Sequence, residues 1–275
     1  MLIGVTSGQS LIEEGSCFHC HTREVSDFQK SVHFNNIVCT NCHGGDMNVG
    51  GQVVSINAMS NNFSGVPARA NITNLCSKCH SEVAGMYEKS IHWKELEKGV
   101  TIAATCTDCH GAHDVLSPKN PESPANPEKV SMLCAKCHEN QTKMQAWYYG
   151  IKTDRFDTYK NSYHYKAYMS SGKVLATCSD CHENHDTRPA SDPKSAINPV
   201  NLPTTCGKTG CHPGASNAVF YGGKVHEGQS VNLLFIDVKK LINYFYIVMI
   251  LFELTLTFGL IFMGISSQYE LRRRH

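Results

Sequence analysis

The sequence predicts a domain of short α-helices and irregular loops with little or no β-sheet, followed by one C-terminal transmembrane helix. Three observations predict this fold: 14 Cys and 15 His among 275 residues, a short Cys–His motif that recurs along the chain, and a long apolar stretch near the C-terminus. The formal net charge of +1 disfavours a nucleic-acid binder, because such proteins neutralise phosphates with many Lys and Arg. A hydrophobic content of 41% excludes a wholly disordered chain.

The recurring motif is Cys-x-x-Cys-His. Six strict copies occur, at Cys17–His21, Cys39–His43, Cys76–His80, Cys106–His110, Cys134–His138 and Cys178–His182. A seventh copy, from Cys206 to His212, has four residues between its cysteines, and together the seven motifs contain all 14 cysteines. We number them motifs 1 to 7 in chain order.

This motif is typical of covalent c-type haem attachment. Two thiols add to the vinyl groups of one haem, and the adjacent His ligates the iron. Zinc sites would pair such motifs without a constant following His, and a redox thiol pair would not recur six times. We therefore expect seven c-type haems, with a disulfide as the alternative at motif 7. The predicted thioether residues are Cys17, Cys20, Cys39, Cys42, Cys76, Cys79, Cys106, Cys109, Cys134, Cys137, Cys178, Cys181, Cys206 and Cys211, and the predicted proximal ligands are His21, His43, His80, His110, His138, His182 and His212.

Six of the remaining eight His lie in two recurring contexts and are the predicted distal ligands. Four lie in similar short segments, mostly Ser-x-His, and two follow a motif by three residues; they are His33, His92, His164, His226, His113 and His185. The seventh iron then needs another ligand. We expect Met59, with His19, Met47 or an open site as alternatives, and the other interpretation of Met59 is a buried gap-filling side chain.

The motifs form a repeat. After a lead over 1–16, the haem domain spans 17–230, with units 17–75, 76–133, 134–205 and 206–230. The second and third units both read Ala-Thr-Cys-x-Asp-Cys-His-x-x-His-Asp, and Pro-rich segments, expected to be extended, connect them. In the first unit Asp46 replaces the second His, and we expect Met59 to make up for that loss. Seven haems in 210 residues predict a core made largely of porphyrin, with neighbouring rings close together.

A linker over 231–240 precedes an apolar stretch over 241–265, which is long enough to cross a bilayer. A buried helix of a soluble protein is the alternative. The basic tail over 266–275 is expected in the cytoplasm and the haem domain outside it, because c-type haem attachment takes place outside the cytoplasm. Residues 2–5 are too short for a signal-peptide core, so we expect that a signal was removed or that the start is truncated.

Glu253 lies near the centre of this apolar stretch. An intramembrane carboxylate is costly and usually faces protein or water. Tyr246, Thr257 and Gly264 fall within about 40° of it on a helical wheel, which makes one polar, small face. This face predicts docking to another membrane subunit. The alternatives are a direct role at a quinone site and a protonated Glu tolerated by tilt.

These motifs resemble the membrane-associated multihaem c-type cytochromes of bacterial and archaeal respiratory chains, over residues 17–226. The Cys-His-Gly-Gly-Asp segment ending at Asp46, the segments around Met59 and Gly65, and the recurring Ser-x-His are similar to a subgroup that works beside a membrane cytochrome b. The resemblance implies that the Met59 position is a distal-ligand position. It also implies a cytochrome b or other quinone-reactive partner. In that subgroup the domain works beside or fused to the cytochrome b, but this chain has a single apolar stretch, so we expect the partner to be a separate polypeptide.

The favoured function is that of an electron-transfer subunit between such a membrane module and an extracytoplasmic carrier or enzyme. No catalytic residue is predicted. One alternative is a multihaem reductase of nitrogen or sulfur compounds, which requires an open iron position; another is a subunit of an extracellular cytochrome filament.

Overall fold

The computed structural model describes residues 17, 20–45, 62–139, 152–215, 226, 232–233 and 236–273. The chain divides into two compact units, one ending at Glu227 and the other beginning at Gly228. His19, Met47 and Met59, the candidates for the seventh distal ligand, lie outside the described residues.

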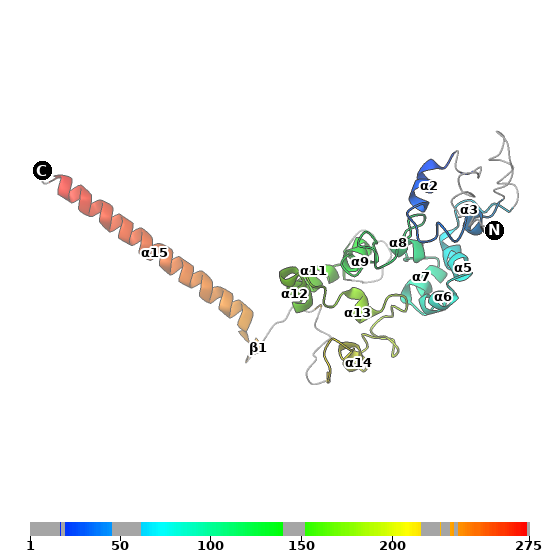
Figure 1. Cartoon of the computed structure of the whole chain (residues 1–275). Helices are drawn as coiled ribbons and strands as arrows, with labels where there is room; N and C mark the ends of the chain where they lie inside the picture. Colours follow the sequence, from blue (N-terminus) through cyan, green and yellow to red (C-terminus); the bar gives the residue numbers. More distant parts are fainter. Residues whose placement is uncertain are drawn as a thin grey trace, which may run out of the picture. The chain divides into compact units, whose positions relative to one another are not determined.

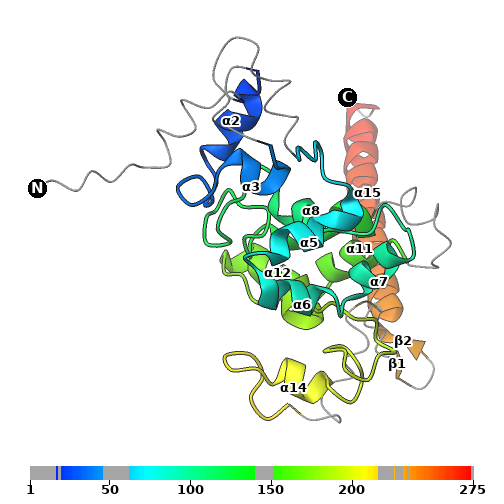
Figure 2. The same ribbon diagram turned by 90° about the vertical axis from the view of Figure 1, so that its right-hand side faces the viewer.

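The compact unit that ends at Glu227 is built from short helices joined by turns, and its described part contains no strand. The predicted fold class is therefore confirmed. In Figure 1, α2 and α3 lie at one end of these helices and α11 and α12 at the other, and the chain then turns back so that α13 lies beside α9. Figure 2 shows the same elements from a perpendicular direction. They are α2 (Thr22–Phe28), α3 (Cys39–His43), η2 (Arg69–Asn71), α5 (Ile72–Ser77), α6 (Ser81–Tyr87), α7 (Ile91–Glu97), α8 (Cys106–His110), α9 (Val130–His138), α11 (Arg155–Lys160), α12 (Tyr163–Ser171), α13 (Cys178–His182) and α14 (Leu202–Cys206).

The even-numbered motifs are themselves helices. Motifs 2, 4 and 6 coincide with α3, α8 and α13. In motif 4 the Asp108 carboxylate accepts hydrogen bonds from the backbone N–H of Thr105 at 2.6 Å and from its hydroxyl at 2.8 Å. Asp180 does the same for Thr177 at 2.8 and 2.6 Å. The repeated Thr-Cys-x-Asp pattern is therefore a helix-start signal inside the haem motif.

Two of the Ser-x-His segments are also helix starts. Ser90 and Ser162 precede α7 and α12, and each hydroxyl accepts a hydrogen bond from the backbone N–H three residues later. This is the N-cap arrangement. It places His92 and His164 at the second position of their helices, where the first turn fixes their backbone.

The Pro-rich connections are chains of turns and not the extended segments that the proline content predicts. In the connection after motif 6 the Ser195 hydroxyl donates to the Arg188 carbonyl at 3.1 Å, and the Asn198 amide donates to the Ala190 carbonyl at 2.9 Å. In the connection after motif 4, Ser123 and Asn126 make the equivalent bonds. These internal hydrogen bonds replace strand pairing and hold both connections compact.

In the described part of the compact unit that ends at Glu227, buried hydrophobic side chains form three small clusters. They centre on Val25 and Phe34, on Leu96, Val100 and Ala103, and on Ala135, Phe156 and Tyr159. None is large enough to be the core of a domain of this length, which accords with a core completed by covalent cofactors.

The described part of the compact unit that begins at Gly228 contains two paired strands of two residues each and one long helix. Strands β1 (Asn232–Leu233) and β2 (Ile236–Asp237) pair antiparallel, and α15 (Val238–Arg273) follows directly. Residues 241–265 of α15 are long and apolar enough to cross a membrane. The helix extends beyond this span at both ends, so its Lys and Arg flanks are helical too.

Candidate haem-binding site

The described structure brings six of the seven predicted proximal His against six predicted distal His, one to one. The ring centroids of each pair lie 6.0 to 6.2 Å apart. The pairs are His80 with His33, His43 with His113, His138 with His92, His110 with His185, His212 with His164, and His182 with His226.

This separation suits an iron between the two rings. A metal–imidazole bond is about 2 Å, and the ligating nitrogen lies about 1 Å from the ring centre, so two axial imidazoles have centroids about 6 Å apart. Direct ring stacking without an intervening atom would bring them closer. Within the described residues no group of three or more His, Cys, Asp or Glu is arranged to hold a metal ion. The two facing imidazoles of each pair fit the two axial positions of a six-coordinate haem.

The pairing crosses the repeat units. Each described Ser-x-His histidine faces the proximal His two motifs further along the chain, as His92 faces that of motif 5. Each His that follows an even motif by three residues faces the proximal His two motifs earlier, as His185 faces that of motif 4. The imidazole pairs therefore connect consecutive repeat units. A backbone hydrogen bond also connects two units, because the Ile91 N–H donates to the Thr187 carbonyl at 2.8 Å.

This pairing changes the interpretation of Asp46. A His at that position would, by the same pattern, serve a motif preceding the first. Its replacement leaves motif 2 with a partner, because His43 pairs with His113. The absence of His at 46 therefore does not by itself require Met59.

Motif 1 is the remaining case. No imidazole of the described part stacks against His21, whose Nδ1 atom lies 3.8 Å from the Glu24 carboxylate. Among the seven predicted proximal His, His21 is thus the one that no described imidazole faces.

Backbone and hydroxyl groups orient two of these imidazoles, and the sequence analysis missed them. His43 Nδ1 lies 2.8 Å from the Gly65 carbonyl oxygen, and His226 Nδ1 lies 2.9 Å from the Thr158 hydroxyl. A hydrogen bond at Nδ1 directs Nε2 towards the partner ring, which is how such second partners orient metal-binding His. Of these two partners, only Gly65 had a signal in the sequence, because it lies in a Gly-Val-Pro segment that takes part in the family resemblance. Thr158 lies 68 residues from His226 and had no such signal.

Burial keeps several of these imidazoles neutral. It lowers the pKa of His92 and of His182 to about 4, with a smaller effect from the partner His in each pair. It also lowers the pKa of His110, His138 and His185. Neutral imidazole is the form that ligates a metal ion.

The attachment cysteines of neighbouring motifs lie side by side. The first cysteines of motifs 1 and 2, 3 and 4, and 5 and 6 are hydrogen-bonding neighbours, as Cys76 is of Cys106. The second cysteines of motifs 2, 4 and 6 interact with a cysteine of the next motif, as Cys109 does with Cys137. These alternating contacts place the seven motifs in one row. None of the 14 cysteines forms a disulfide in the structure, including Cys206 and Cys211.

Tight turns follow the even motifs. Gly44 and Gly111 have φ of +67° and +84°, and a Cβ at Gly44 would collide with the Asn62 carbonyl oxygen. In motif 6 the same place is taken by Glu183 at φ 66° and ψ 166°, a region that glycine alone adopts without strain. Glu183 is therefore a strained residue directly after His182.

Comparisons with known proteins agree with this geometry. Residues 45–120 match the family model described as NapC/NirT cytochrome c family, N-terminal region, and residues 100–143 match the doubled CXXCH motif. A similar protein is the multiheme cytochrome MtrA of Shewanella baltica (strain OS185), 26% identical over 212 residues that cover 72% of this chain. The chain spans about half the length of that relative, because the match covers 52% of it. No solved structure matches.

The motifs, the imidazole pairs and the comparisons together define the class of protein. The chain is a multihaem c-type cytochrome that carries one candidate membrane-spanning helix. Within that class it is similar, over residues 45–120, to the NapC/NirT cytochromes.

Proposed function

We propose that this chain is the electron-transfer subunit of a respiratory membrane complex and binds seven c-type haems. The observation that carries the proposal is the set of six imidazole pairs with centroids 6.0 to 6.2 Å apart, one for each of motifs 2 to 7. When bound, each haem supplies a reversible one-electron Fe(III)/Fe(II) change. The protein holds the sites in a row, and no bond-making residue is required.

The six paired His are the axial ligands of motifs 2 to 7 in this proposal. Met59 is the distal ligand of motif 1. A Met ligand raises the potential of its iron relative to a bis-His site, so the haem of motif 1 has the highest potential of the row. A row of bis-His sites also favours a carrier over a reductase, because a reductase needs an open iron position.

The proposed setting is the extracytoplasmic face of the cell membrane. The apolar part of α15 is the single anchor, the haem domain lies outside the cytoplasm and the Arg tail lies inside. The partner in the membrane is a cytochrome b or another quinone-reactive protein, and a soluble carrier or enzyme meets the haem domain. The NapC/NirT match over residues 45–120 supports a quinone-linked partner.

Gentle detergent extraction of native membranes tests the partner. The chain should co-purify with a polytopic protein, and the reduced-minus-oxidised spectrum should contain b-type as well as c-type bands. A lone chain with c-type bands only would contradict a stable membrane complex.

Haem counting and carbon monoxide test the site itself. The intact mass should exceed that of the polypeptide by seven haems. Carbon monoxide should leave the spectrum of the reduced protein almost unchanged, because all seven sixth positions are filled. Binding at several irons would favour a reductase instead.

A further inference from the structure

The imidazole pair of motif 4 has a carboxylate on each side. His110 and His185 form this pair. Asp108 lies two residues before His110 within the motif, and Asp186 directly follows His185. A carboxylate beside an iron stabilises Fe(III) and lowers the reduction potential, unless a cation compensates its charge. The charge partners of these two carboxylates therefore bear on the haem that motif 4 would bind.

Arg69 is the partner on the proximal side. Its Nη2 atom donates to the Asp108 carboxylate at 2.6 Å and to the Ala103 carbonyl at 2.7 Å, and its Nη1 atom donates to the same carboxylate at 3.3 Å. The side chains of Arg69 and Asp108 are 39% and 38% exposed. Because the guanidinium also binds a backbone carbonyl, its charge is held at a fixed place beside motif 4.

Arg188 is the partner on the distal side. Its Nε and Nη2 atoms donate to the Asp186 carboxylate at 2.7 and 3.0 Å, and its Nη1 atom donates to Asp192 at 3.2 Å. The Lys94 Nζ atom lies 3.9 Å from the Asp192 carboxylate, so two cations balance two carboxylates here. The Arg188 side chain is only 10% exposed, so solvent screens its charge less than that of Arg69.

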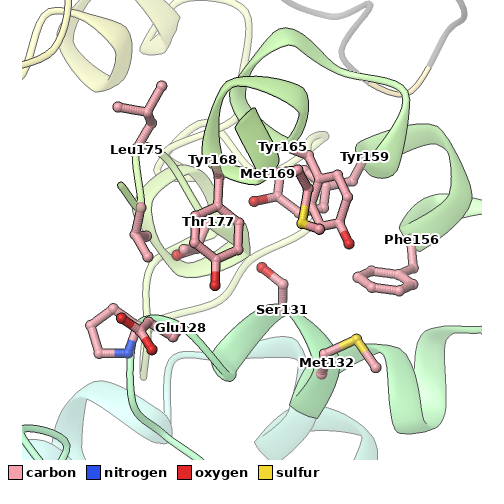
Figure 3. Close-up of a pocket in the computed structure, with 12 residues that line it drawn as sticks. Glu128, Ser131, Met132, Phe156, Tyr159, Tyr165, Tyr168, Met169, Leu175 and Thr177 are labelled. Atoms are coloured by element: carbon pink, nitrogen blue, oxygen red, sulfur yellow. The ribbon is translucent and has the colours of Figure 1, made fainter. Parts of the chain in front are cut away.

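Beside motif 6, the place that corresponds to Arg69 is a cavity of about 190 Å³ (Figure 3). Pro127 stands seven residues before motif 5, as Arg69 stands before motif 3, and it lines this cavity together with Leu175 and Thr177. Leu175 stands three residues before motif 6, as Ala103 stands before motif 4. The chain therefore repeats the surroundings of Arg69 without repeating the arginine.

The start of the motif helix does not require this arginine. Asp180 of motif 6 accepts hydrogen bonds from the backbone N–H and the hydroxyl of Thr177, as its equivalent does in motif 4. Within the described residues, no Arg or Lys side chain pairs with the Asp180 carboxylate. The capped helix thus forms with and without a cation at the carboxylate.

The turns after the motif do not require Arg188 either. In the connection after motif 4, Leu116 takes its place three residues after the distal His. The Ser123 hydroxyl donates to the Leu116 carbonyl at 3.4 Å, and the Ser195 hydroxyl donates to the Arg188 carbonyl at 3.1 Å. Both connections use the backbone at this place, and only one carries a charged side chain there. The two arginines are therefore additions at motif 4 and not requirements of the repeat.

We propose that Arg69 and Arg188 raise the reduction potential of the haem of motif 4 by compensating the charges of Asp108 and Asp186. Reduction adds one electron and no atom at this site, so a nearby positive charge favours it and a nearby negative charge opposes it. The two His of motif 4 cannot set its potential apart, because five other motifs have the same pair. The proposal rests on the proposed function for the haem and its axial ligands.

A spectroelectrochemical titration of the full-length, haem-loaded protein in detergent tests this proposal. Arg69→Gln and Arg188→Leu should each move a one-electron step to a lower potential, by about 30 mV or more, which is about a threefold change in the equilibrium constant of that step. Arg188→Leu introduces the residue that the chain itself has at position 116. Its shift should be the larger one, because Arg188 is the more buried arginine.

Variants that keep the charge separate electrostatics from structure. Arg69→Lys and Arg188→Lys lose the forked hydrogen bonds but keep a cation, so they should retain most of the potential. Lys129→Gln is the control, because it removes an exposed cation that pairs with Glu122 at 3.5 Å outside any motif. It should leave every step in place.

A His185→Ala background identifies the haem. This change should open the iron of motif 4, and carbon monoxide should then hold that haem as Fe(II) and remove it from the titrated steps. Under carbon monoxide, adding Arg188→Leu should move no remaining step. A shift that persists there would overturn the inference, as would arginine variants without any shift or lysine variants that shift as far as the neutral ones. Failure of His185→Ala to bind carbon monoxide would instead overturn the axial ligation given under the proposed function.

Discussion

At the scale of single residues, motif 1 differs from the other six motifs because no described imidazole faces His21, and Met59 is its proposed distal ligand. Met59→His should convert a His/Met site into a bis-His site and lower the potential of one haem. We expect a shift of about 0.1 V or more, within the roughly 0.8 V range that axial ligands span. A spectroelectrochemical titration measures it. Met47→Leu is the control and should leave every potential in place; an unchanged titration for Met59→His would remove Met59 as a ligand.

The strained residue after motif 6 gives a second prediction. Glu183→Gly should stabilise the protein by about 1 kcal/mol, because glycine adopts φ 66° and ψ 166° without the steric penalty of a Cβ. The bond that Glu183 makes to Lys208 at 3.0 Å is exposed, and its loss costs little. Thermal unfolding of the haem-loaded protein measures the effect. Lys166→Gly, at an exposed position inside α12, should instead lower the unfolding midpoint.

The sequence predicts a site residue where its role depends on residues next to it in the chain. The Cys-x-x-Cys-His motif names its own thioether and proximal residues, and the Ser-x-His context singled out His33, His92 and His164. Which iron each distal His faces was not readable, because the paired residues lie far apart, as His164 and His212 do. The orienting partners Gly65 and Thr158 were missed for the same reason.

At the scale of the helix, the Ser caps position the distal His. Ser90 is fully buried, and its hydroxyl accepts the Trp93 N–H at 3.2 Å. Ser90→Ala should lower the stability by about 1 kcal/mol, as the loss of an N-cap does, and loosen the helix that carries His92. Thermal unfolding measures the first effect, and broadening of the ferric low-spin signal in electron paramagnetic resonance measures the second. Ser170→Ala, an exposed serine of α12, should change neither.

Elements were predicted well where they coincide with the motifs and poorly between them. Short helices around the motifs and a long C-terminal helix follow directly from spacing and hydropathy. The Pro-rich connections were expected to be extended, because proline excludes long helices. They are hydrogen-bonded loops instead, because Ser and Asn side chains donate to nearby backbone carbonyls; these residues are Ser123, Asn126, Ser195 and Asn198. The prediction considered only the prolines and not these side-chain hydrogen bonds.

At the scale of the whole molecule, the imidazole pairs connect one repeat unit to the next, and the proposal makes each pair the two axial ligands of one haem. His113→Ala should open the iron of motif 2, not that of motif 4 beside which it lies in the sequence. The reduced variant should bind one equivalent of carbon monoxide. In a background that lacks the haem of motif 2, made by Cys39→Ser and Cys42→Ser, the same change should create no new binding site. A new site in that background would assign His113 to another iron.

The candidate membrane-spanning helix α15 presents one polar face, and that face should decide partner binding. Glu253, with Tyr246, Thr257 and Gly264 within about 40° of it, combines a costly carboxylate with small and hydrogen-bonding residues, as helix contacts in membranes do. Glu253→Leu should weaken association with the membrane partner about tenfold, since interhelical hydrogen bonds are worth about 1–2 kcal/mol.

The amount of partner retained in gentle detergent extraction measures this weakening. Thr255→Val is the matched control, because residue 255 points about 160° away from residue 253 on a helical wheel. It should retain the partner, since its hydroxyl already bonds within the helix to the Leu251 carbonyl at 3.0 Å. Equal loss with both variants would mean that α15 needs only its overall apolarity and length. Equal retention would mean that the polar face has no partner, and that the haem domain alone holds the complex together.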